Sequence, residues 1–166
     1  SDRQVLFSTQ KVPLEQMGTF YNMVDVTINI SDAEGFGLAT LESLSCGTPI
    51  IANMTGGLQE QVVGPEGENG VAIFPSSKAV IGSQQVPYIY EDRINKESFM
   101  AALDKIYFSD EEARKELGAK GHRHVRQNYS FDNFEKQWVD TMLEVYEQHG
   151  SWSTNKYSNI VFKEVA

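Results

Sequence analysis

Along the first part of the chain, the spacing of apolar residues alternates between the two-residue period of strands and the three-to-four-residue period of helices. Residues 5–8 form a short apolar run that indicates a strand. After Pro13, apolar residues recur at helical spacing: Leu14, Met17, Tyr21 and Val24. Residues 24–30 then alternate apolar and polar positions with a two-residue period, which predicts a second strand.

The succession of strands and helices continues through the first half of the chain. Residues 38–46 read as a helix that Gly47 is expected to end, and residues 49–52 are an apolar run typical of a buried strand. A short helix through residues 62–63 and a strand over 70–74 follow. This alternation predicts an α/β fold with a Rossmann-like parallel sheet and helices on both of its faces.

The second half of the chain begins with a break in this succession. Residues 76–95 show no clear period and exceed the usual length of connections in compact domains, which predicts a long inserted loop with a functional or protective role. Three helical patterns expected to cover the sheet come next: residues 97–108, 110–127 and 130–148. Ser130 is the expected N-cap of the last one. We therefore predict one domain over residues 1–149, with the tail 150–166 unassigned.

Composition narrows the classes of partner. The 166 residues carry a formal net charge of −9, a field that opposes binding to a nucleic-acid backbone. The single cysteine, Cys46, excludes an internal disulfide and fits a reducing compartment. No apolar run approaches the ~18–20 residues that cross a bilayer. We expect a soluble, cytoplasmic protein that binds small molecules or proteins, with no membrane contact.

A glycine-containing turn leads from the strand over 24–30 into the next helix. Ligands of open α/β sheets bind at such strand-to-helix turns. Gly35 and Gly37 allow the backbone to come close to a ligand. The free amides at the start of the helix, around Leu38 and Ala39, suit a diphosphate through hydrogen bonds and the helix dipole. The turn therefore predicts an anion-binding cradle.

Two carboxylates, Glu34 and Glu42, flank this cradle. A carboxylate near a phosphate is unfavourable unless it accepts hydrogen bonds from hydroxyl groups, which a sugar supplies. Glu42 lies roughly 6–9 Å along the helix axis from the first amides, a separation suited to the ribose beside a diphosphate. Glu34 precedes the glycines and would face the opposite end of the diphosphate. We predict one acid for each sugar of a nucleotide-sugar.

A set of short motifs surrounds these acids. In order along the chain they are Tyr21-Asn22-Met23-Val24-Asp25-Val26, Ser31, Glu34-Gly35-Phe36-Gly37-Leu38, Leu41-Glu42-Ser43, Cys46-Gly47-Thr48-Pro49-Ile50-Ile51-Ala52 and Gly56-Gly57. Together they resemble the glycosyltransferase group 1 family of retaining GT-B enzymes, which includes glycogen and sucrose synthases. The two acids have the spacing of the family's E-x7-E element. The resemblance covers residues 5–74 and extends more loosely to residue 148.

The resemblance implies the C-terminal half of a GT-B fold, followed by C-terminal helices, that binds the nucleotide-sugar donor of a retaining glycosyltransferase. Such an enzyme would move a hexose-type sugar to a glycan, lipid or other hydroxyl acceptor, as in polysaccharide biosynthesis. Glu34 would contact the donor sugar near the reacting carbon and Glu42 the ribose hydroxyls. The other donor-binding candidates form two backbone walls: Gly35, Phe36, Gly37, Leu38, Ala39, Thr55, Gly56 and Gly57. No metal or other cofactor is expected, because the helix amides would hold the diphosphate.

The family's acceptor-binding N-terminal domain and the basic loop that neutralises the diphosphate lie upstream of the matched region. We therefore expect this chain to be a fragment whose missing partner is that domain, and to be inactive alone. Two alternatives stay open: a nucleotide-sugar epimerase of the same architecture, and a non-catalytic interaction module that retained the fold.

Other polar residues have plainer interpretations. Asp32-Ala33-Glu34 resembles a metal-binding D-x-D motif, but the amide cradle makes a metal unnecessary. Cys46 is expected to be a small buried residue rather than a nucleophile. His122 and His124 are two positions apart on a predicted helix, so they diverge and are expected to be solvated, as is His149.

Overall fold

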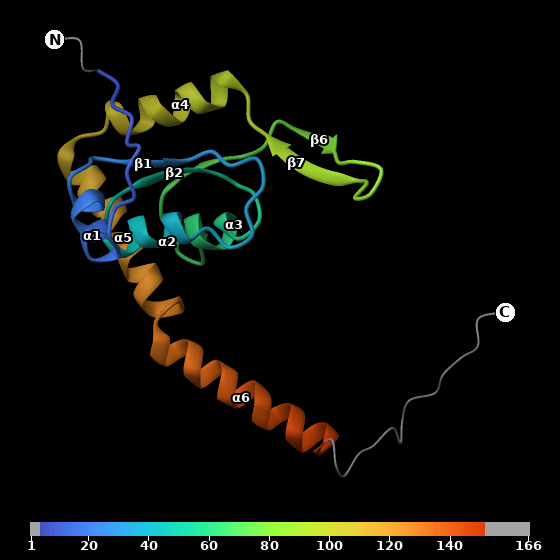
Figure 1. The fold of residues 1–166 in the computed structure, drawn as a ribbon. Helices are drawn as coiled ribbons and strands as arrows, with labels where there is room; N and C mark the ends of the chain where they lie inside the picture. The colour runs from blue at the N-terminus through green and yellow to red at the C-terminus, as the bar shows by residue number, and fades with distance from the viewer. Residues whose placement is uncertain (1–3, 152–166) are drawn as a thin grey trace. The chain divides into compact units, whose positions relative to one another are not determined.

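A computed structural model describes residues 4–151 of the chain, which divide into two compact units (Figure 1). The first unit is Ser1–Gln127, of which residues 4–127 are described. The second unit is Asn128–Ala166, of which residues 128–151 are described. The unassigned tail lies outside the described residues from residue 152 onward. Within residues 4–151, no helix combines the length and the apolar composition that a bilayer crossing requires.

The first described residues differ from the prediction. The expected strand over residues 5–8 is absent, and the apolar side chains there are exposed. An apolar run becomes a strand only where a neighbouring strand accepts its hydrogen bonds, and among the described strands β1 (Thr27–Asn29) pairs with β2 (Ile50–Asn53) alone. The predicted helix after Pro13 does form, as α1 (Leu14–Asn22).

A parallel sheet of three strands forms the centre of the first unit, which confirms the predicted fold class. Its order is β1-β2-β5, where β5 is Val71–Ile73. In the register, Thr27 is opposite Ile50, and Ile51 is opposite Val71. The connections between parallel strands contain helices α2 (Leu38–Ser45) and α3 (Leu58–Val62), as βαβ units require.

Helices lie on both faces of this sheet (Figure 1). On one face, Ile51, Val71 and Ile73 form a buried cluster with Ala102 and Ile106 of α4 (Lys96–Tyr107). On the other face, α2 and α3 contact β2 and contribute fully buried side chains: Leu44, Leu58 and Val62. The central strand β2 is therefore buried on both sides, which explains why residues 50–52 are apolar without alternation.

Residues 76–95 form an antiparallel hairpin rather than the expected loop. It consists of β6 (Ser77–Ile81) and β7 (Ile89–Arg93), with Ser77 opposite Arg93 and Ile81 opposite Ile89. The prediction missed it because neither strand has one clearly buried face, so no two-residue period appears in the sequence. A short second hairpin, β3 (Val63–Gly64) with β4 (Gly67–Glu68), was also not predicted.

Helix α5 (Glu111–Asn128) packs closely through its glycines. A Cβ placed on Gly118 would lie 2.0 Å from the carbonyl oxygen of Gly47, and one on Gly121 would lie 2.5 Å from Leu44 Cδ2. The face of α5 that carries Gly118 and Gly121 therefore points toward the core, and His124 lies on this face. His124 is consequently 8% exposed, with Nε2 3.0 Å from the carbonyl oxygen of Glu60, so the prediction that it is solvated was wrong.

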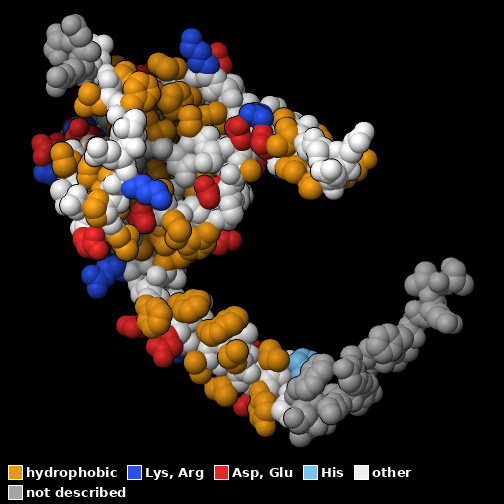
Figure 2. Space-filling model, in the orientation of Figure 1, with side chains coloured by type: hydrophobic (Ala, Val, Ile, Leu, Met, Phe, Trp, Pro, Cys, Tyr) orange, Lys and Arg blue, Asp and Glu red, His pale blue; other side chains and the backbone are white. Residues whose placement is uncertain are grey.

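The second unit contains α6 (Phe131–His149). The predicted N-cap is confirmed, because the Ser130 hydroxyl accepts a hydrogen bond from the Asn133 amide at 3.3 Å. An apolar stripe runs along the helix, visible as orange side chains in Figure 2, and Phe134 stacks on Trp138 within it. No residue of α6 is buried. That this stripe covers the sheet stays a prediction.

Two glycines at helical positions give a matched test of the α5 contact. Gly118→Ala should destabilise the fold by about 1–3 kcal/mol, because its methyl group would collide with the Gly47 backbone. Gly18→Ala in α1 meets no atom within 4 Å and should stabilise the fold by about 0.5–1 kcal/mol. Urea unfolding of both variants measures the difference. Equal stability changes would show that the α5 contact is looser than described.

Candidate functional site

The candidate site begins at the carboxyl end of β1, where the chain turns into α2. Gly37 is the residue before the helix, and its φ of 88° lies in the left-handed region that favours glycine. Gly37 is buried, whereas its neighbours Gly35 and Phe36 are exposed. The first two residues of α2, Leu38 and Ala39, are exposed, whereas Thr40 is fully buried.

The start of α2 offers unused amides. Leu41 donates the first hydrogen bond of the helix, to the Gly37 carbonyl oxygen at 3.2 Å. The amides of Leu38, Ala39 and Thr40 precede it and have no acceptor within the helix. Gly37 has no side chain that could cap them, and Leu38 and Ala39 are exposed. That these amides bind an anion, as the sequence predicts, stays a prediction.

The two predicted backbone walls meet each other directly. A Cβ on Gly56 would lie 1.7 Å from the Glu34 carbonyl oxygen, and one on Gly57 would lie 2.7 Å from the Phe36 carbonyl oxygen. The Gly57 amide donates to the carbonyl oxygen of Gly35 at 3.1 Å. The residues after β1 and those after β2 therefore form one continuous backbone surface.

Both acids, Glu34 and Glu42, are half-buried. Glu34 precedes the glycines, and Glu42 lies within α2. The Oε2 atom of Glu42 accepts a hydrogen bond from the Tyr21 hydroxyl of α1 at 2.7 Å. The sequence did not predict this contact: Tyr21 belongs to the apolar stripe of α1 and to the first motif of the family resemblance, and neither connects it with Glu42. A phenol on that stripe is the one signal that could have suggested it, because a packed tyrosine usually needs a hydrogen-bond partner.

Burial and the nearby Glu42 carboxylate raise the pKa values of two groups, Tyr21 and Cys46. Burial, and then the hydrogen bond to Glu42, raise the pKa of Tyr21 to about 12. Burial, and then the negative charge of Glu42, raise the pKa of the Cys46 thiol. Tyr21 is therefore a protonated donor at neutral pH, and Cys46 is a thiol of low reactivity.

The base of the β6–β7 hairpin ties the site together. The Asp92 amide donates to the Asp32 carbonyl oxygen at 2.7 Å, and the Asp92 carboxylate accepts from the Thr55 hydroxyl at 2.8 Å. Arg93 forms an ion pair with the Asp32 carboxylate. The Asn53 amide group also donates to the Ser31 carbonyl oxygen at 2.9 Å. These bonds fix the segment before Glu34 against the segment that contains Thr55.

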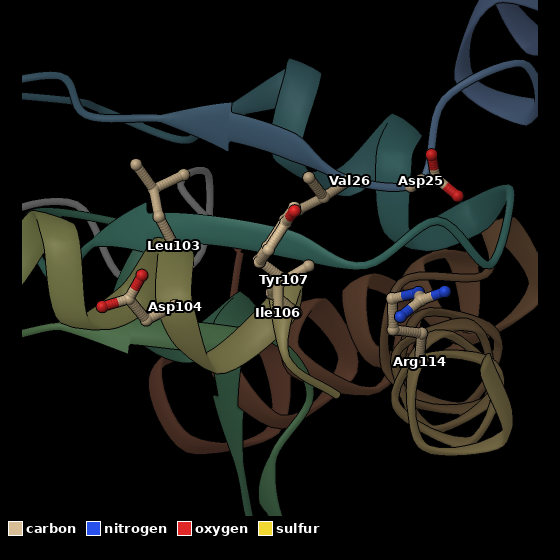
Figure 3. Close-up of a pocket in the computed structure, with 7 residues that line it drawn as sticks. All are labelled: Asp25, Val26, Leu103, Asp104, Ile106, Tyr107 and Arg114. Atoms are coloured by element: carbon tan, nitrogen blue, oxygen red, sulfur yellow. The ribbon is translucent and has the colours of Figure 1, made fainter. Parts of the chain in front are cut away.

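A cavity of about 540 Å³ lies elsewhere in the first unit (Figure 3). Its lining residues are Asp25, Val26, Leu103, Asp104, Ile106, Tyr107 and Arg114. Asp25 and Val26 precede β1, so the cavity lies at the amino end of that strand, whereas Glu34 follows its carboxyl end. Ligands of parallel sheets bind at carboxyl ends, and no candidate residue lines this cavity. The cavity is therefore separate from the candidate site.

Comparison with known proteins identifies the family. Residues 3–100, more than half of the chain, match the glycosyl transferases group 1 family. The chain belongs to this family. The expected resemblance is thereby confirmed, and the domain is a group 1 glycosyltransferase domain of the C-terminal, GT-B type.

The matches to two curated relatives each extend over more than four fifths of this chain. Trehalose synthase of Pyrococcus horikoshii is 27% identical over 141 residues, which are 85% of this chain and 28% of that protein. A D-inositol 3-phosphate glycosyltransferase of Thermomonospora curvata is 33% identical over 135 residues, which are 81% of this chain and 25% of that protein. The glycosyltransferase domain thus spans about a quarter of the length of these relatives.

Two solved structures share the fold. The C-terminal domain of a glycosyl transferase group 1 family protein from Francisella tularensis has a TM-score of 0.55 at 25% identity, covering 78% of this chain and 56% of that one. Sucrose-phosphate synthase from Thermosynechococcus elongatus has a TM-score of 0.62 at 25% identity, covering 83% of this chain and 29% of that one.

The single cysteine of this glycosyltransferase domain reports on the charge of Glu42. Glu42→Gln removes one of the two causes that raise the pKa of Cys46, so alkylation by iodoacetamide at pH 8 should become about two- to fivefold faster. The rate is measured by mass spectrometry of the intact chain. Glu34→Gln serves as the control and should leave the rate unchanged. An unchanged rate for Glu42→Gln would contradict the placement of Glu42 beside Cys46.

Proposed function

We propose that this chain is the donor nucleotide-sugar-binding domain of a retaining glycosyltransferase, which moves a hexose-type sugar to a glycan, lipid or other hydroxyl acceptor. The observation that carries the proposal is the exposed start of α2 between two half-buried acids. Backbone amides favour a diphosphate, and carboxylates favour sugar hydroxyls. A nucleotide-sugar contains both groups, with a sugar at each end of the diphosphate.

In this proposal the diphosphate binds the amides of Leu38 and Ala39, Glu42 accepts from the ribose, and Glu34 accepts from the donor sugar. Negative charge grows on the diphosphate as the sugar leaves, and the α2 amides would stabilise it. The acceptor hydroxyl oxygen would then attack from the face that the nucleotide leaves and pass its proton to the departing diphosphate, so that the anomeric configuration is retained. No metal is needed on the diphosphate.

The relatives support glycosyl transfer by the names of their activities, among them D-inositol 3-phosphate glycosyltransferase and sucrose-phosphate synthase. Because the chain spans about a quarter of its curated relatives, we propose that its partner is an acceptor-binding N-terminal domain. The isolated chain would then bind the donor and transfer little sugar.

Titration of the isotope-labelled chain with uridine, guanosine and adenosine diphosphate glucose tests donor binding by NMR. One donor should shift the amide signals of residues 35–42, equally in magnesium and in EDTA. No shift with any donor would favour a non-catalytic interaction module. Product analysis of a complete protein that contains this chain separates a transferred sugar of retained configuration from the isomerised donor that an epimerase would release.

The glycines of the site give a prediction about ligand approach. A Cβ on Gly35 meets no atom within 4 Å, and its φ lies outside the left-handed region, so Gly35→Ala should leave the stability unchanged. If a donor approaches this backbone closely, Gly35→Ala should nevertheless weaken donor binding about tenfold or more. Gly56→Ala should instead destabilise the fold by about 2 kcal/mol or more, because of its contact with Glu34 and its φ of 49°. Isothermal titration and urea unfolding separate the two effects, and unweakened donor binding by Gly35→Ala would contradict the proposed backbone contact.

The two acids should differ in their kinetic effects in the complete protein. Glu42→Ala removes a contact made by the nucleotide in the ground state and transition state alike, so it should mainly raise KM. Glu34→Ala acts near the reacting carbon and should mainly lower kcat, by about 10- to 100-fold. Steady-state kinetics with varied donor concentration measures both constants. Wild-type activity in Glu34→Ala would remove the assignment of Glu34.

A further inference from the structure

We propose that Tyr21 is a positioning residue for ribose recognition, which holds the Glu42 carboxylate in the orientation that accepts a ribose hydroxyl. This inference rests on the proposed function. Its basis is the hydrogen bond of 2.7 Å from the Tyr21 hydroxyl to Glu42 Oε2, made between α1 and α2. A carboxylate has two acceptor oxygens, so this bond leaves Oε1 for a hydroxyl of the nucleotide.

Tyr21 is itself fixed on the same scaffold as Glu42. The hydroxyl of Thr48, which is 5% exposed, donates to the Tyr21 carbonyl oxygen at 2.7 Å. The hydroxyl of Ser43, the residue after Glu42, donates to the Thr48 carbonyl oxygen at 3.0 Å. Ser43 is fully buried. The backbones that carry the phenol and the carboxylate are therefore linked through Thr48 to the buried face of α2.

A neutral donor suits this role better than a cation. A lysine or arginine at this position would offset the negative charge of Glu42, whereas the phenol hydroxyl leaves that charge on the carboxylate. A charged acceptor forms stronger hydrogen bonds with sugar hydroxyls than a neutral one does. The raised pKa of Tyr21, about 12, keeps its proton in place throughout the neutral range.

Preorganisation is the physical benefit. A long glutamate side chain at a half-exposed position loses rotamer freedom when it binds a ligand, and that loss weakens binding. The bond from Tyr21 restricts the Glu42 rotamer before the nucleotide arrives. The effect should be seen only with ligands that carry the hydroxyl that Glu42 recognises.

The test compares ribonucleotides with deoxyribonucleotides. Wild type and Tyr21→Phe are titrated with uridine, guanosine and adenosine diphosphate and with their 2′-deoxy forms by isothermal titration. Wild type should prefer the ribose form of the nucleotide that it binds. Tyr21→Phe should bind that form about three- to tenfold more weakly while its affinity for the deoxy form stays unchanged, since one hydrogen bond of ordinary net strength is lost.

Three comparisons make the result decisive. Tyr107→Phe, at a tyrosine that is 80% exposed, is the matched control and should retain the full ribose preference. Glu42→Gln should reduce the preference, and adding Tyr21→Phe to Glu42→Gln should have no further effect. Tyr21→Phe is expected to fold, because it keeps the aromatic ring that packs. Urea unfolding of this variant checks the expectation.

Four outcomes would each overturn a defined statement. Equal affinity of wild type for the ribose and 2′-deoxy forms would overturn the contact between Glu42 and the 2′-hydroxyl that this inference requires. An unchanged ribose preference in Tyr21→Phe would overturn the positioning role. Equal weakening of ribose and deoxyribose forms would also overturn it, since it would indicate a purely structural effect. If the folded wild-type chain binds none of the six nucleotides or their sugar conjugates, the proposed function fails, and this inference fails with it.

Discussion

The candidate site depends on the close approach of two backbone segments, the turn after β1 and the turn after β2. The distance is so short that a methyl group on Gly56 would overlap the Glu34 carbonyl oxygen. Because no side chain separates the turns, the backbone from Glu34 to Phe36 and the backbone of Gly56 and Gly57 form one surface at the carboxyl edge of the sheet. The parallel sheet makes this possible, since it brings the ends of β1 and β2 to the same edge.

The net charge of −9 bears on how the proposed diphosphate would bind. The general field of the chain would repel such a ligand, so binding would rely on local groups whose partial charges point at the phosphate. The amides at the start of α2 are groups of this kind. The proposed donor site, on a helix end rather than on cationic side chains, is therefore consistent with the acidic composition.

The β6–β7 hairpin changes how the site is understood. Expected as a loop, it is instead an ordered element whose base bonds to Asp32 and Thr55. Asp92 and Arg93 make these contacts at the end of β7, just before α4 begins. The hairpin thus supports the turn that carries Glu34, although nothing in the sequence of residues 76–95 predicted a contact with that turn.

Local sequence patterns were enough to predict the order of the central strands and helices, the start of α2 and the spacing of Glu34 and Glu42. These features arise from local periods, glycines and helix caps, which neighbouring residues specify. Three features became apparent only in the folded chain: the contact of Tyr21 with Glu42, the packing of Gly56 on Glu34 and the burial of His124. Each of these joins residues more than twenty positions apart, or, for His124, depends on which helix face the core covers. No local pattern encodes such contacts, because they exist only after the sheet and its helices have packed.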